Sequence, residues 1–78
     1  MTRRDVLDAM GEIVSLPPGS LRGDEPLTAI PGWDSLCGVT FRVAVQKRWQ
    51  VSLPGPALSR CETVRDVIAL LGSRVTEG

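Results

Sequence analysis

Stretches rich in proline and glycine break this chain into short segments, and the longer segments carry apolar residues at helical spacing. The breaks SLPPGS at 15–20 and LPGP at 53–56 end any helix that reaches them, because proline lacks a backbone N–H. No alternating apolar and polar pattern of useful length for a strand occurs. We therefore expect an all-α fold: a small four-helix bundle with three main helices, one short helix and a long first loop.

The first helix is expected to begin near Thr2, because Thr2 and Asp5 have a spacing that resembles a capping box. Its apolar residues follow helical spacing at Val6, Leu7, Met10, Ile13 and Val14. The connection at 20–34 is long, and its apolar residues are Leu21, Leu27, Ile30 and Trp33. A loop with this many apolar side chains is expected to pack across the bundle.

The second helix is expected to run from about Asp34 or Ser35 to Trp49. Phe41, Val45 and Trp49 recur every four residues, which indicates the face turned toward the core. A second stripe of the same helix is largely apolar and consists of Leu36, Val39, Thr40 and Val43. This stripe is either a surface for a partner or a contact with another helix of the bundle, and periodicity alone favours the bundle contact.

The remaining chain predicts one helical turn at about 56–59 and a last helix that begins at Thr63, where Asp66 completes another capping pattern. The buried stripe of this last helix is Val64, Val67, Ile68 and Leu71. Gly72 is suited to its C-terminal cap. We expect a single domain over residues 1–78, with a helical core at about 4–72 and a frayed tail at 73–78.

The composition excludes several classes of function, because the net charge is zero, histidine is absent and only two cysteines occur. Cys37 and Cys61 are too few for a disulfide framework, and a zinc site needs about four ligands. Without histidine there is no Ser-His or Cys-His nucleophile pair. The balanced charge does not favour nucleic acid or an anionic membrane, and no apolar run approaches a membrane span. We expect a cytoplasmic monomer with reduced thiols, no metal and no catalytic residue.

Ser35 has two interpretations. Asp34 and Ser35 are common residue types at helix starts, and this pair alone favours a purely structural role. A hydroxyl in the first helical turn also lies beside unpaired N–H groups and the positive end of the helix dipole, where an attached phosphate is favoured. Since the chain has no histidine and no lysine near Ser35 in sequence, we expect this serine to accept a modification rather than to act as an enzyme's nucleophile.

The stretch LTAIPGWDSLCGV at 27–39 resembles the modification site of the acyl carrier protein family. The residues that match the family pattern are Leu27, Gly32, Asp34, Ser35, Leu36 and Val39. DVLDAMGEIVSLPPGSL at 5–21 is similar to the family's first helix and its exit. WQVSLP at 49–54 is similar to the stretch after the second helix, and CETVRDVIALL at 61–71 is similar to the last helix. The resemblance thus covers the chain from about residue 4 to 72.

The resemblance implies a right-handed four-helix bundle in which Ser35 receives 4′-phosphopantetheine from coenzyme A, through a magnesium-dependent phosphopantetheinyl transferase. The thiol of this arm would hold acyl groups as thioesters in polyketide or related specialised-metabolite biosynthesis. The bundle core, or the groove beside the second helix, would shelter the acyl chain. An acyl-loading enzyme and a ketosynthase or acyltransferase would be further partners. The residues implied in partner recognition are Asp34, Leu36, Val39, Thr40, Arg42, Val43 and Lys47.

The chain departs from the fatty-acid carriers of this family, whose second helix is usually acidic. No Asp or Glu occurs from 35 to 61, whereas the basic residues there are Arg42, Lys47, Arg48 and Arg60. Partners that recognise an acidic helix through basic residues would be repelled, so we expect specialised enzymes rather than housekeeping fatty-acid synthesis. Arg42 stands where the family often has an apolar residue. It either reduces the room for a long acyl chain or lies with its stem over the core edge.

Two alternatives stay open. A peptidyl or aminoacyl carrier of nonribosomal peptide-type assembly tends to have Gly-Gly-x-Ser, whereas the sequence GWDS at 32–35 favours the acyl type. An unmodified helical module would instead bind a partner through the apolar stripe of the second helix. Cys37 and Cys61 are interpreted as small apolar packing residues in each case.

Overall fold

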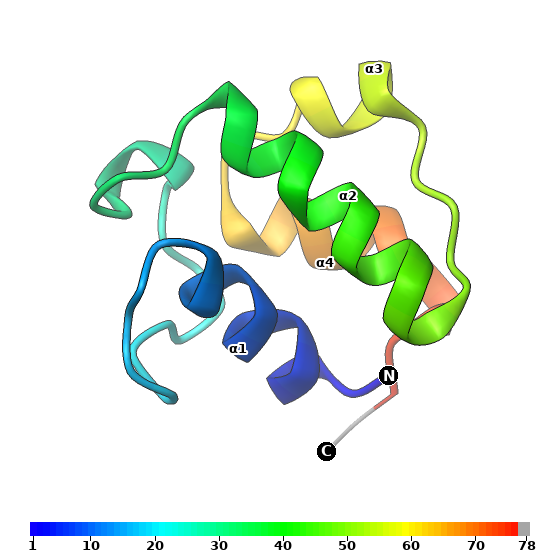
Figure 1. The fold of residues 1–78 in the computed structure, drawn as a ribbon, viewed down its shortest axis with the longest axis horizontal. Helices are drawn as coiled ribbons and strands as arrows, with labels where there is room; N and C mark the ends of the chain where they lie inside the picture. The colour runs from blue at the N-terminus through cyan, green and yellow to red at the C-terminus, as the bar shows by residue number, and fades with distance from the viewer. Residues whose placement is uncertain (77–78) are drawn as a thin grey trace.

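Four α-helices surround one apolar core in the computed structural model, which describes residues 1–76 (Figure 1). They are α1 at Arg3–Ile13, α2 at Ser35–Trp49, α3 at Gly55–Ser59 and α4 at Val64–Leu71. Two 3-10 turns, η1 at Leu27–Ala29 and η2 at Gly72–Arg74, complete the helical elements. Residues 1–76 contain isolated β-bridges but no strand. The expected three main helices, one short helix and long first connection are confirmed.

The two capping boxes that the sequence predicts are both present. Thr2 Oγ1 accepts a hydrogen bond from Asp5 N–H at 3.0 Å, and Asp5 Oδ2 accepts one from Thr2 N–H at 2.9 Å. Thr63 and Asp66 make the same reciprocal pair at 3.1 Å in each direction. Each pair satisfies backbone donors that the first turn of a helix leaves without partners, which fixes the starts of α1 and α4.

The core lies where α1, α2, α3 and α4 meet, and α2 contacts both α1 and α3. Phe41 and Val45 of α2 are fully buried, as their four-residue spacing predicts. The other fully buried side chains are Met10, Val6, Val64 and Val67. Trp49 is only partly buried, because it lies in the last turn of α2 at the edge of the core. Burial of each large apolar side chain stabilises the fold by roughly 1.5–3 kcal/mol.

The long connection between α1 and α2 packs against the bundle, as its apolar content predicts. Leu21 and Ile30 are buried members of the core. The connection is also tied to the start of α4, since Leu27 N–H donates to the Glu62 carbonyl at 2.8 Å and Val64 N–H donates to the Glu25 carbonyl at 2.9 Å. This two-bond bridge holds η1 in place, and η1 in turn forms one wall of the groove described below.

The C-terminal segment does not follow the expectation of a frayed tail at 73–78. Residues 72–74 form η2, and Thr76 N–H donates to the Met1 carbonyl at 2.9 Å. The Thr76 carbonyl accepts from Arg3 N–H at 3.2 Å, so this segment lies beside the N-terminus (Figure 1). Pairing with a distant segment supplies the backbone partners that a free tail would lack. Residues 77–78 of the expected tail lie outside the described residues.

Candidate functional site

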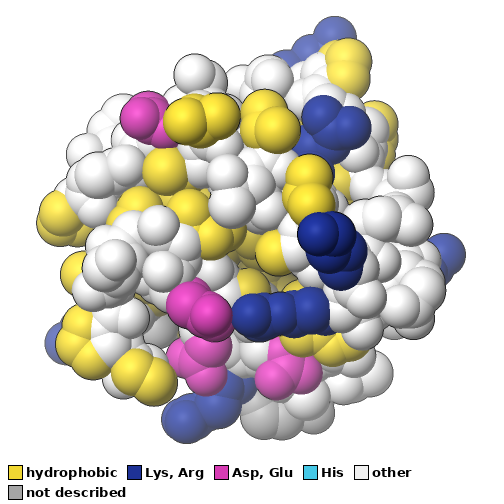
Figure 2. All heavy atoms as spheres, viewed as in Figure 1, with side chains coloured by type: hydrophobic (Ala, Val, Ile, Leu, Met, Phe, Trp, Pro, Cys, Tyr) yellow, Lys and Arg dark blue, Asp and Glu magenta, His cyan; other side chains and the backbone are white. Residues whose placement is uncertain are grey.

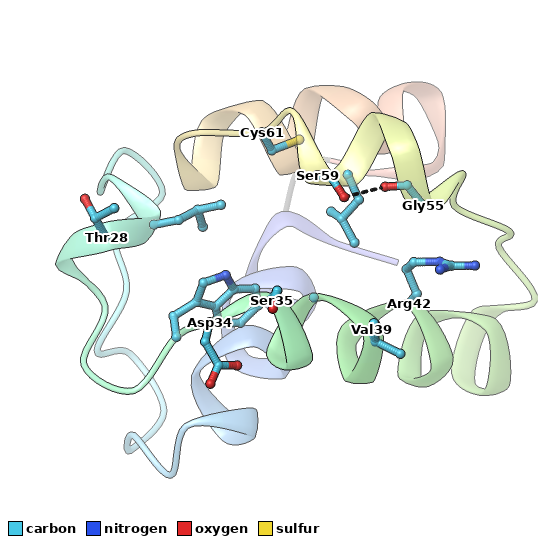
Figure 3. A pocket seen from close by; sticks show the side chains of 12 residues that line it. Thr28, Asp34, Ser35, Val39, Arg42, Gly55, Ser59 and Cys61 are labelled. Atoms are coloured by element: carbon cyan, nitrogen blue, oxygen red, sulfur yellow. Dashed lines mark hydrogen bonds between the residues drawn. The ribbon is translucent and has the colours of Figure 1, made fainter.

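A groove of about 390 Å³ opens between η1, the first half of α2 and α3 (Figure 3). Its apolar lining residues are Leu27, Trp33, Val39, Leu58 and Cys61. Gly38 of α2 and Gly55 of α3 also line it, and their lack of side chains keeps the space between the two helices open. A mostly apolar groove of this volume with few polar groups is the usual form of a small-molecule site.

Ser35 is the first residue of α2, is exposed and lines the groove. Its hydroxyl takes part in none of the hydrogen bonds found within residues 1–76. In Figure 3, Thr28 and Arg42 lie toward opposite ends of the groove, with Ser35 between them. The oxygen is therefore accessible from solvent and adjacent to an apolar space, and it belongs to the helical turn where N–H groups are free.

Asp34 is the N-cap of α2, as predicted. Its Oδ1 accepts a hydrogen bond from Cys37 N–H at 3.1 Å, and its main-chain carbonyl accepts from the same N–H at 3.1 Å. The hydrogen bond from Cys37 N–H lowers the pKa of the Asp34 carboxyl below its ordinary value of 3.8. A carboxylate with a lowered pKa is a weak base, so Asp34 is poorly suited to activate the neighbouring Ser35 hydroxyl.

Arg42 connects α2 to the segment that precedes α3. Its Nε donates to the Leu53 carbonyl at 3.1 Å, and its guanidinium lies against Gly55. Leu53 is buried, so the Arg42 side chain lies over the edge of the core, as one of the two interpretations of this residue proposes. The same side chain lines the groove at the end opposite Thr28 (Figure 3).

The structure separates the predicted site residues into two groups. Asp34, Ser35, Val39 and Arg42 line the groove. Leu36, Thr40, Val43 and Lys47 recur at helical spacing on the outward side of α2, and all four are exposed. The interpretation of the second apolar stripe as a bundle contact is therefore wrong: Leu36 is 71% exposed and Val43 is 48% exposed.

The outward side of α2 ends in basic residues. Hydrophobic side chains follow α2 from its start, and Lys and Arg side chains gather toward its C-terminal end (Figure 2). Lys47 and Arg48 occupy the last turn, where the helix dipole favours positive charge. Both side chains are exposed, but Arg48 Nη2 lies 3.3 Å from Glu12 Oε2 of α1, whereas Lys47 makes no ion pair within residues 1–76.

Sequence reasoning did not assign Thr28, Gly55, Leu58 or Ser59 to the site, although all four line the groove. Leu58 and Ser59 belong to α3, whose position against α2 is set by packing rather than by a local signal. The Pro-Gly-Pro sequence at 54–56 is the one sequence signal for this wall, because it marks the start of α3: Pro54 is the N-cap, and Gly55 and Pro56 are the first helical residues.

The described residues offer little other chemistry. Within residues 1–76, no three Cys, Asp or Glu side chains gather in a way that could hold a metal ion. Both cysteines are free thiols, and Cys37 Sγ donates to the Gly32 carbonyl at 3.4 Å. Burial, together with the nearby Asp66 charge, raises the pKa of the Cys61 thiol, which keeps it protonated and unreactive.

None of the helices in residues 1–76 has the length and apolar content that crossing a membrane requires.

Comparison with known proteins finds no family model, no curated protein and no solved structure that matches this chain.

Proposed function

We propose that this chain is an acyl carrier whose Ser35 is modified with 4′-phosphopantetheine. The observation that supports this most is the position of Ser35: an exposed hydroxyl on the first residue of α2, at the edge of a largely apolar groove. The resemblance of residues 27–39 to the modification site of acyl carrier proteins supports the same proposal from the sequence.

The residues around Ser35 fit a phosphodiester. The first turn of α2 has backbone N–H groups without intrahelical partners, and the helix dipole is positive there. Asp34 is the one acidic residue among those described as lining the groove, and its carboxylate already accepts a hydrogen bond from Cys37 N–H. A phosphate on Ser35 Oγ would therefore extend into solvent from a terminus that stabilises negative charge.

In the proposed transfer, a bond forms between Ser35 Oγ and the phosphorus of the pantetheine phosphate in coenzyme A. The bond from that phosphorus to the oxygen of 3′,5′-ADP breaks, and the hydroxyl proton passes to a base of the transferase. The base comes from the partner because Asp34, the nearest carboxylate in sequence, has a lowered pKa. When bound, the arm supplies a thiol that holds acyl groups as thioesters, and Leu27, Leu58 and Val39 offer it an apolar wall.

The outward side of α2 is proposed to meet the partner enzymes. Leu36 and Val43 expose large apolar side chains there, and Val39, which lines the groove, is exposed as well. Exposed apolar residues gathered along one helix mark interaction surfaces. The adjacent charge is basic, with Lys47 in the last turn and no Asp or Glu from 35 to 61. These features favour specialised enzymes with acidic contact surfaces over the enzymes of housekeeping fatty-acid synthesis.

The same exposed stripe favours a second candidate function, an unmodified helical module that binds a partner through Leu36, Val39 and Val43. The two candidates differ in one respect: the carrier needs the Ser35 hydroxyl, and the module does not.

The test is the intact mass of the protein after incubation with coenzyme A, magnesium and a broad-specificity phosphopantetheinyl transferase. The expected result is a gain of one phosphopantetheine group in the wild type and none in Ser35→Ala. Ser59→Ala is a matched control, since Ser59 also lines the groove but belongs to α3. No gain in the wild type would overturn the carrier assignment in favour of the module. An equal gain in Ser35→Ala would overturn the assignment of Ser35 as the modified residue.

A further inference from the structure

Arg42 is the one cationic residue among those described as lining the groove, and it stands at the end opposite Thr28 (Figure 3). Most of the lining surface is apolar, and the polar residues that share it with Arg42 are Thr28, Asp34, Ser35 and Ser59. The Arg42 side chain is exposed, so its guanidinium lies in solvent at the mouth of the groove, where an anionic ligand can reach it.

The guanidinium still has free hydrogen-bond donors. Arginine carries five N–H donors, and only Arg42 Nε has an acceptor within residues 1–76, the Leu53 carbonyl at 3.1 Å. The salt bridge found in this part of the chain joins Arg48 to Glu12 and does not involve Arg42. Both terminal nitrogens of Arg42 are therefore available, and a carboxylate can accept two parallel bonds from such a pair.

The local backbone holds this guanidinium in position. Arg42 Nε donates to the Leu53 carbonyl, and Gly55 lies close to Arg42 Nη1. A Cβ atom added at Gly55 would stand 2.9 Å from Arg42 Nη1, closer than side chains normally approach. An anchored guanidinium loses less entropy on binding an anion than a free one does.

No acidic residue of the neighbouring segments competes for Arg42. Residues 35–61, which include all of α2 and α3, contain no Asp or Glu. Asp34, the acidic residue among those described as lining the groove, lies at the start of α2, and its carboxylate accepts a hydrogen bond from Cys37 N–H. The groove thus has a positive charge at one end that is available to an anionic ligand.

Ser35 and Arg42 share one side of α2, because a separation of seven residues is close to two helical turns, or about 10 Å along the axis. Val39 lies between them and lines the groove. A flexible arm on Ser35 is longer than this spacing, so its acyl end reaches Arg42 only when the arm folds along the groove.

We propose that Arg42 binds a carboxylate at the far end of the acyl group, so that this carrier prefers acyl groups derived from dicarboxylic acids over simple alkyl acyl groups. The proposal rests on the carrier function proposed above. The apolar wall formed by Val39 and Leu58 contacts the methylene chain, and Arg42 pairs with the terminal carboxylate.

The test compares glutaryl and pentanoyl groups, which have the same number of carbons and differ in the terminal carboxylate. The transferase loads each group on Ser35 from the corresponding acyl-coenzyme A, and intact mass confirms loading. The readout is the rate at which hydroxylamine cleaves each thioester, normalised to the same acyl group on free pantetheine. We expect glutaryl cleavage to be about two- to fivefold slower in the wild type than in Arg42→Gln, a range typical of partly exposed ion pairs.

Two further variants separate position from charge. Gly55→Ala keeps Arg42 but forces the flexible end of its side chain to shift, and we expect it to reduce the protection of the glutaryl group. Arg60→Gln removes an exposed arginine that does not line the groove, and it should behave as the wild type does. The rate of pentanoyl cleavage should be the same in the wild type and in the three variants, Arg42→Gln, Gly55→Ala and Arg60→Gln. The side-chain Nε–H resonance of Arg42 should shift with glutaryl loading and not with pentanoyl loading.

The outcomes distinguish the two proposals. Loading without any difference between wild type and Arg42→Gln would overturn the carboxylate site and leave the carrier function in place. Equal protection of glutaryl and pentanoyl groups would do the same. Failure to load either group on Ser35 would overturn the carrier function, and the carboxylate site with it.

Discussion

The Asp34 carboxylate accepts a hydrogen bond from the backbone N–H of Cys37 at 3.1 Å, so the acid that precedes Ser35 closes the first turn of the helix that Ser35 begins. This contact fixes the start of α2 and thereby the position of the Ser35 hydroxyl at the groove. Asp34 therefore has a structural role that does not depend on any partner.

The first prediction concerns this cap. Asp34→Ala removes the acceptor for Cys37 N–H and the negative charge at the helix start, so thermal unfolding should shift down by about 5 °C. Asp34→Asn keeps an acceptor oxygen, so it should lower the thermal unfolding midpoint by less than Asp34→Ala does. Circular dichroism at 222 nm during heating measures both variants. Equal midpoints for wild type and Asp34→Ala would contradict the structural role of this contact.

The second prediction concerns pH. Hydrogen bonds from backbone N–H groups lower the pKa values of Asp34, Asp5 and Asp66, with Cys37, Thr2 and Glu62 as the respective main donors. The folded chain therefore binds fewer protons than the unfolded chain near the ordinary value of 3.8. These bonds contribute full stability above that value, and the contribution is lost as the pH falls through the lowered values of the folded state.

Urea unfolding at a series of pH values from neutral to acidic measures this loss. The triple variant Asp5→Asn, Asp34→Asn and Asp66→Asn keeps acceptor oxygens but cannot titrate at these positions, so its free energy of unfolding should change less over the acidic range. If the free energy of unfolding of the triple variant falls with pH as steeply as that of the wild type, other groups dominate the loss of stability in acid.

The third prediction compares two valines of α2. Val45 is fully buried, whereas Val43 is 48% exposed. Val45→Ala should lower the free energy of unfolding by about 2 kcal/mol, from lost burial and the cavity left behind. Val43→Ala should change it by less than about 0.5 kcal/mol. Both changes alter helix propensity equally, so the difference in urea unfolding reports burial alone. Similar losses in the two variants would contradict the assigned orientation of α2.

The helices could be predicted from sequence because their signals are local. The Thr2–Asp5 and Thr63–Asp66 pairs lie within one turn of the helices they cap, and Pro-Gly breaks end the segments between them. The core face of α2 followed from the spacing of Phe41 and Val45.

The groove could not be predicted in the same way. Leu58 shares the groove with Ser35 only because α3 docks beside α2, and the bond from Arg42 to the Leu53 carbonyl depends on the path of the connecting segment. The pairing of Thr76 with Met1 likewise joins opposite ends of the chain. Periodicity reports which side of a helix is apolar but not which helix covers it, and this explains why periodicity alone favoured a bundle contact for the exposed stripe of α2.

The last prediction concerns the basic end of α2. The ketosynthase of housekeeping fatty-acid synthesis, which recognises an acidic carrier helix, should bind this chain more weakly than its own carrier, because Lys47 and the absence of Asp and Glu from 35 to 61 oppose its basic contacts. Lys47→Glu should strengthen binding by about threefold at low salt, and Lys47→Gln should have a smaller effect.

Lys47 is a better position for this change than Arg48, because Arg48 is paired with Glu12. Surface plasmon resonance at two ionic strengths measures the effect, which should shrink at high salt as screening increases. Wild-type binding as tight as that of the enzyme's own carrier would contradict a role for this charge in partner choice.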